Sequence, residues 1–82
     1  MNRLPDERAQ PYEAWEQKAK ELIEREMENA GIGYKRLARL LTDLGINESA
    51  GQINRKVNRK RFSTAFFIAC MLAMEVRQIS LE

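Results

Sequence analysis

The sequence has 82 residues, 44% of them hydrophobic and 32% charged, which is the balance of one small soluble globular domain. It contains no histidine and a single cysteine, Cys70, so an internal disulfide is excluded and the commonest general base and metal ligand is missing. We therefore expect neither enzymatic activity nor a cofactor or metal.

Two features of the sequence favour a cytoplasmic location. A single cysteine suits a reducing compartment, and the first residues lack the apolar stretch of a signal peptide. The longest apolar run, residues 65–74, is about half as long as a membrane span. We expect that run to form a buried helix, and we expect no contact with a membrane.

Charge is distributed unevenly along the chain. Residues 1–30 have a net charge of −3 and residues 65–82 a net charge of −1, whereas residues 31–64 have a net charge of +6. A basic centre between acidic ends is typical of a nucleic-acid-binding face on an otherwise neutral domain.

The two ends of the chain are predicted to lie outside the folded domain, which spans residues 12–78. Residues 1–11 are polar and contain both prolines, which indicates a flexible arm that either reaches a DNA minor groove or is a solvated tail. Residues 79–82 form a C-terminal tail, and its Leu81-Glu82 is typical of a cloning remnant.

The first helix is predicted over residues 12–30. Pro11 suits the start of a helix, and Gly31 suits its end. One apolar stripe at helical spacing comprises Trp15, Ala19, Leu22, Ile23, Met27 and Ala30.

A second helix is predicted to begin near Tyr34, with Gly33 as its N-cap, and to end at Gly45. The residues expected to face inward are Leu37, Ala38, Leu41 and Leu44.

A third helix is predicted to follow Ser49. Ser49 and Gln52 have the spacing of a capping box, in which each side chain bonds the backbone of the other residue. Ile53 and Val57 form the inward face. Because the apolar stripe stops at Val57, this helix should be short.

The fourth helix is predicted over residues 63–76, with Ser63 as its N-cap and with Phe62 and Phe67 as a hydrophobic staple. Its apolar residues run almost all the way round, so it needs cover from the first helix or from a second copy of the chain. No segment alternates with a period of two, so we predict an all-α four-helix bundle without a sheet.

The second and third helices have the features of a helix-turn-helix. Ala38 is small enough to let the two helices approach, and Gly45 permits a positive φ at the turn. Ile53 and Val57 anchor the second of these helices, and its remaining side chains are polar or basic.

A basic run follows the start of the third helix, where five of the seven residues from Arg55 to Arg61 are cationic. We interpret the run as a clamp on DNA phosphates, formed by Lys56, Asn58, Arg59, Lys60 and Arg61. Two other interpretations are a solvated charged surface and salt bridges to the acidic first helix.

This region resembles the Cro and phage-repressor type of helix-turn-helix domain. The likeness is carried by Leu37-Ala38, Gly45-Ile46, Ile53 and the loop Asn58-Arg59-Lys60-Arg61. In that family, glycine is common at the position of Arg59. The resemblance implies a lambda-repressor-like fold with three base-reading residues, Gln52, Asn54 and Arg55. Because Gln52 is also the capping residue, we rank Arg55 above it.

The chain is also similar to a small bacterial domain family of unknown function with an Arg-x-Arg-Phe-Ser…Phe-Phe signature. That signature corresponds here to residues 59–63 and to Phe66-Phe67. The likeness covers roughly residues 14–76 and implies no particular activity.

We therefore predict a DNA-binding transcriptional regulator that acts on double-stranded DNA as a homodimer. The alternative is a protein-interaction or oligomerisation module without direct nucleic-acid binding, and RNA binding is a third interpretation. Basic residues that converge on one exposed face would favour the first function, whereas an exposed apolar patch would favour the second.

Overall fold

The computed structural model describes residues 11–82, which contain four α-helices and no strand. The helices are α1 (Glu13–Ala30), α2 (Tyr34–Asp43), α3 (Ala50–Arg59) and α4 (Thr64–Ala73). The predicted all-α class with four helices is therefore confirmed. Within the same range, no helix combines the length and apolar composition that crossing a membrane requires. Nearly all of the predicted arm, residues 1–10, lies outside the described residues.

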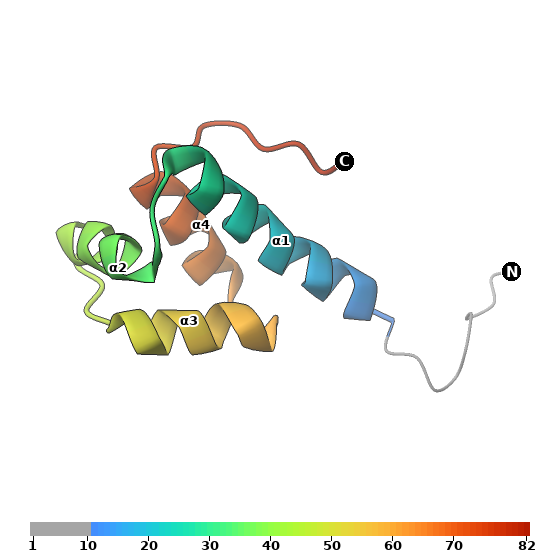
Figure 1. Ribbon diagram of the computed structural model, residues 1–82. Helices are drawn as coiled ribbons and strands as arrows, with labels where there is room; N and C mark the ends of the chain where they lie inside the picture. Colours follow the sequence, from blue (N-terminus) through green and yellow to red (C-terminus); the bar gives the residue numbers. More distant parts are fainter. Residues whose placement is uncertain (1–10) are drawn as a thin grey trace, which may run out of the picture.

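The helices are arranged as two crossed pairs. Both α3 and α4 pack against α1 and against α2. Figure 1 shows α3 along the lower edge, α2 at the left, and α4 behind the long diagonal of α1. The C-terminal segment returns above α1, where the Arg25 guanidinium donates a hydrogen bond of 2.9 Å to the backbone carbonyl of Ser80.

Each helix contributes two or three side chains to a single core. The buried residues are Leu22, Ile23 and Met27 from α1, Leu37 and Leu41 from α2, Ile53 and Val57 from α3, and Phe66, Cys70 and Met71 from α4. Burial is the main cause that raises the pKa of the Cys70 thiol, to about 12. The thiol therefore stays protonated at neutral pH, and the predicted core position of Cys70 is confirmed.

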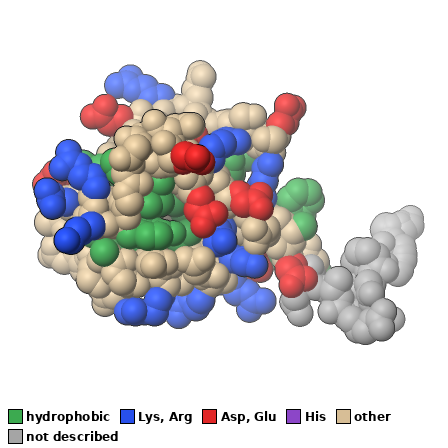
Figure 2. Space-filling view, in the orientation of Figure 1, with side chains coloured by type: hydrophobic (Ala, Val, Ile, Leu, Met, Phe, Trp, Pro, Cys, Tyr) green, Lys and Arg blue, Asp and Glu red, His purple; other side chains and the backbone are tan. Residues whose placement is uncertain are grey.

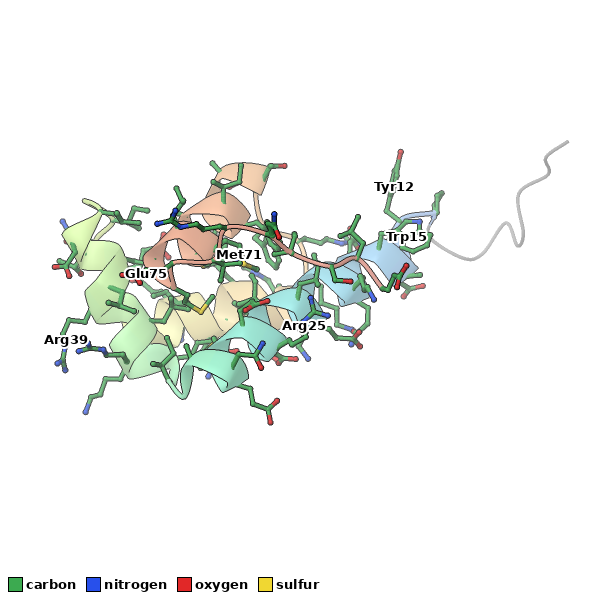
Figure 3. The ribbon with its side chains drawn as sticks, turned by 90° about the horizontal axis from the view of Figure 1, so that it is seen from above. Tyr12, Trp15, Arg25, Arg39, Met71 and Glu75 are labelled. Carbon is green, nitrogen blue, oxygen red and sulfur yellow. The ribbon has the colours of Figure 1, made fainter. Side chains whose placement is uncertain are left out.

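Three residues that were predicted to face inward are exposed. Trp15 is 66% exposed, Leu44 is 50% exposed, and Ala30 is also on the surface. Figures 1 and 3 show that the N-terminal end of α1 projects beyond the other helices, so no helix covers Trp15. Helical spacing predicts the face on which a side chain lies, but burial also requires a partner at that height along the helix.

The predicted starts of α3 and α4 are confirmed by their capping hydrogen bonds. The Ser49 hydroxyl accepts from the Gln52 backbone N–H at 3.1 Å, and the Gln52 side-chain oxygen accepts from the Ser49 N–H at 2.8 Å. Ser63 caps α4 in a similar way, and the rings of Phe62 and Phe67 stack with centroids 6.4 Å apart. Each such cap contributes about 1 kcal/mol to stability.

The end of α4 differs from the prediction, because the helix stops at Ala73 rather than near Val76. Glu75 adopts a left-handed φ of 60°. Its N–H donates to the Leu72 carbonyl at 2.9 Å, and the Val76 N–H donates to the Met71 carbonyl at 2.9 Å. This Schellman motif turns Val76 back onto the core. Glycine usually occupies the left-handed position, so the sequence contains no signal for this helix end.

We expect Glu75→Gly to raise the free energy of unfolding by about 0.5–1 kcal/mol. Glycine adopts a positive φ without the steric cost of a Cβ atom, and the larger entropy of the unfolded chain offsets only part of this gain. Urea denaturation followed by circular dichroism measures the change. Glu75→Ala is the control, since it removes the same carboxylate but keeps the Cβ; equal stability of the two variants would contradict the left-handed assignment.

Candidate nucleic-acid interface

The turn between α2 and α3 sets the direction of α3. Gly45 has a φ of 88°, and its N–H donates to the Thr42 carbonyl at 2.9 Å. Ile46 then packs against the core, and α3 follows after residues 47–49. Ile53 and Val57 are fully buried, so one side of α3 is fixed to the domain and the opposite side is left to solvent.

The three predicted base-reading residues, Gln52, Asn54 and Arg55, all lie on the exposed side of α3. The Gln52 side-chain oxygen is engaged in the capping box, and the Asn54 side chain accepts a hydrogen bond from Asn58. Within residues 11–82, no side chain bonds the Arg55 guanidinium. A Cβ atom at Gly51 would stand 3.5 Å from its Nη1, so this group lies beside the first turn of α3.

A hollow of about 340 Å³ lies along this side of α3. Its lining is polar and consists of Glu48, Gln52, Arg55, Lys56 and Arg59. Cations outnumber the one carboxylate, so the hollow favours an anionic group.

Lys56 was predicted to bind phosphate, but its ammonium is held within the domain. Its Nζ lies 2.6 Å from a carboxylate oxygen of Glu48 and 4.9 Å from the centroid of the Phe66 ring. The other Glu48 oxygen is buried without a hydrogen-bond partner among the described residues. Lys56 therefore ties the segment before α3 to the core, and much of its charge is balanced locally.

Arg61 is also paired, because its Nε lies 3.4 Å from the carboxylate of Glu16 on α1. For this one residue, the structure contains the salt bridge to the first helix that the sequence analysis considered. The pair lies at the surface, where such a contact contributes little to stability and leaves the guanidinium accessible.

Asn58, another predicted phosphate ligand, faces the α2–α3 junction. Its amide donates to the Asn54 carbonyl at 2.9 Å. Burial is the main cause that raises the pKa of Tyr34 on α2, and the Asn58 side chain acts in the opposite direction. The Asn58 amide is thus engaged with Asn54.

Arg59 and Lys60 complete the predicted clamp, and neither forms a salt bridge with another described residue. Arg59 ends α3 on the exposed side. The residue with the left-handed backbone is Lys60, with a φ of 67°, rather than Arg59, the position at which glycine is common in the phage-repressor domains that this loop resembles. The clamp is therefore brought together only in part: Arg59 and Lys60 are unpaired among the described residues, Arg61 is in a surface pair that leaves it accessible, and Lys56 and Asn58 are engaged within the domain.

A second group of cations, on α2, was not predicted from the sequence as part of the site. Lys35, Arg36 and Arg39 are all exposed. Figure 2 shows Lys and Arg side chains at the left, over α2, and along the lower edge, beneath α3, and Figure 3 places Arg39 on the outer side of α2. These three cations contribute to the net charge of +6 of residues 31–64, but only the basic run of residues 55–61 was assigned a role.

The family described as domain of unknown function DUF6471 matches residues 15–79, which is most of the chain and includes nearly all of the four helices. The chain belongs to that family. No curated protein and no solved structure matches it significantly.

The DUF6471 domain also exposes apolar side chains, on the outer side of α4. Ile68 is 50% exposed and Leu72 is 60% exposed. Together with Ile79 of the C-terminal segment they border a hollow of about 200 Å³. The domain thus has both features that were expected to discriminate between the two functions, a basic surface on α2 and α3 and an apolar surface on α4.

Proposed function

We propose that this domain is a DNA-binding helix-turn-helix of the lambda-repressor-like type, that α3 is its recognition helix, and that it regulates transcription. The observation that carries the proposal is the division of α3 into two sides. Ile53 and Val57 are buried, while Arg55 and Arg59 lie exposed on the outer side with no salt-bridge partner among residues 11–82.

The dimensions and charges of α2 and α3 suit a DNA duplex. An α-helix with its side chains is about 10–12 Å across, and the major groove of B-DNA is about 12 Å wide, so the exposed side of α3 can enter it. The cations of α2 and those at the end of α3 then approach the phosphates that flank the groove. These contacts position the protein without reading sequence.

Arg55 is the residue best placed to read bases. Its guanidinium makes no hydrogen bond with the other described residues and lies beside the first turn of α3, the part of a recognition helix that contacts base edges. Arginine recognises guanine through two parallel hydrogen bonds in the major groove. Gln52 has its oxygen in the capping box, and Asn54 is bonded to Asn58, so both contribute less.

We expect Arg55→Ala to weaken binding to the preferred duplex by about 1–3 kcal/mol and to relax its sequence preference. Arg59→Ala and Lys60→Ala should instead weaken binding to all duplexes alike, because they remove phosphate contacts. The preferred site comes from selection among random duplexes, and fluorescence anisotropy gives the affinities. Arg77→Ala, at an exposed position after α4, is the matched control. Equal losses for Arg55→Ala on all duplexes would contradict base reading.

We further propose that the domain acts as a homodimer joined through α4. Ile68 and Leu72 are exposed on α4 and form a surface suited to self-association. Figures 1 and 3 show α4 at the back of the domain while α3 lies along the lower edge. Two copies placed back to back about a vertical two-fold axis would therefore present both recognition helices on the same side.

Sedimentation equilibrium at tens of micromolar should give about twice the monomer mass of 9.6 kDa. Leu72→Glu should return the mass to that of a monomer, because it places a charge in the apolar contact. Leu44→Glu, at a position that is 50% exposed at the end of α2, should leave the dimer intact. A monomer mass for the unmodified chain would refute self-association in the absence of DNA.

The apolar surface of α4 also favours a second candidate function, a protein-interaction module without direct nucleic-acid binding. In that case Ile68 and Leu72 would contact a different protein. A chain that is monomeric and binds no duplex at about 50 mM salt would favour this function over DNA binding.

A further inference from the structure

A second hollow, of about 490 Å³, lies where the first turn of α1 meets the loop after α3. Three aromatic rings line it, those of Tyr12, Trp15 and Phe62. Two cations, Lys60 and Arg61, line it as well. The hollow is open to solvent, and its lining combines flat apolar faces with positive charge.

The aromatic rings at this hollow are exposed to an unusual degree. Tyr12 is 70% exposed and Trp15 is 66% exposed, although both belong to the residue types that usually bury most of their surface. Figure 3 shows both residues at the projecting end of α1, away from the rest of the domain. Phe62, the third ring of the lining, is anchored to the domain: its ring centroid lies 5.5 Å from that of Phe66, and the ring stacks on Phe67.

Arg61 and Lys60 reach the hollow from the loop after α3. Arg61 is bound to Glu16, which lies one turn from Tyr12 on α1, at a distance of 3.4 Å. The left-handed backbone of Lys60 ends α3 and turns the loop toward α1. A ligand in the hollow would therefore meet both the flat faces of the aromatic rings and the positive charge of Lys60 and Arg61.

We propose that this hollow binds an unpaired nucleotide of a single-stranded nucleic acid. The base stacks on Trp15 and Tyr12, and the phosphate next to it contacts Lys60 and Arg61. Every base has a flat face, so such binding tolerates any sequence. An acidic peptide would also be attracted to the cations. It has no nucleobase, however, that could stack on the two exposed aromatic side chains.

This site differs from the proposed duplex contact, because it involves neither Arg55 nor the exposed side of α3. The two sites share only the loop after α3. A duplex at α3 and an unpaired strand at α1 would therefore lie next to each other along one bound nucleic acid.

Trp15 is the only tryptophan, so its fluorescence reports directly on the hollow. Oligothymidylate at low salt should quench it, because a stacked base contacts the indole. A deoxyribose-phosphate oligomer of the same length without bases is the control and should produce little quenching. Equal quenching by the two oligomers, or none by either, would overturn the proposal.

Variants separate this site from the duplex site. Trp15→Ala should weaken oligothymidylate binding about tenfold in fluorescence anisotropy, Trp15→Phe should retain most of it, and Leu44→Ala should match the unmodified chain. Arg55→Ala should leave oligothymidylate binding unchanged while it weakens duplex binding. Loss of duplex binding alone leaves this proposal standing, whereas unchanged oligothymidylate affinity in Trp15→Ala overturns it. Circular dichroism checks that each variant keeps its helices.

Discussion

Raising the salt concentration from about 50 to about 200 mM should weaken binding to duplex DNA roughly 150-fold. Each phosphate contact contributes a slope of about −0.9 to the dependence of log K on log salt, and we expect about four contacts per chain. The cations that the structure leaves exposed for this role include Lys35 and Arg39 on α2 and Arg59 at the end of α3. Lys60, half-buried in the next position, is the fourth.

The slope itself tests which residues contact phosphate. Arg59→Ala should reduce its magnitude by about 0.9, whereas Lys56→Ala should change it less, because Lys56 is already paired with Glu48. A duplex RNA of the same sequence, titrated in parallel, should bind more weakly, since its deep and narrow major groove does not admit α3. Failure to bind any DNA duplex at about 50 mM salt would contradict DNA binding by this chain alone.

Ile53→Ala should lower the free energy of unfolding by about 2–5 kcal/mol, which is a large part of the stability of a small domain. Ile53 is fully buried on the inner side of α3. Truncating it therefore leaves a cavity between α3 and the rest of the core. Urea denaturation and thermal melting, both followed by circular dichroism at one protein concentration, measure the loss.

An apolar side chain at an exposed position outside the proposed dimer contact provides the control. Leu44 is 50% exposed at the end of α2, so Leu44→Ala should lower stability by much less than Ile53→Ala. Ile53→Val should fall between the two, at about 0.5–1.5 kcal/mol, because it removes a single methyl group. Similar losses at Ile53 and Leu44 would contradict the core position of Ile53.

Two carboxylates form ion pairs with cations of the basic run and so restrict where their side chains lie. Glu48 holds Lys56 against Phe66, which orients the start of α3, and Glu16 holds Arg61 beside α1. The first contact is partly buried and stabilises the position of α3. The second is at the surface, and a phosphate can compete with Glu16 for Arg61.

The class of the fold and most helix boundaries follow from the amino-acid sequence alone. Gly31, Gly45, Ser49 and Ser63 all act within a few residues, through a positive φ or a capping hydrogen bond, so their effects can be predicted locally. The end of α4 could not be predicted in this way, because Glu75 adopts a conformation that its residue type does not favour.

Which side chains of the candidate site remain available depends on how the four helices pack. The pairing of Arg61 with Glu16 joins residues 45 positions apart, and no local spacing specifies it. Trp15 continues the apolar stripe of α1, yet it is exposed because no helix lies opposite it. The charge and the apolar periodicity of a segment can be read from its sequence. Whether a charge is neutralised and whether an apolar side chain is buried depend on which segments meet when the four helices pack.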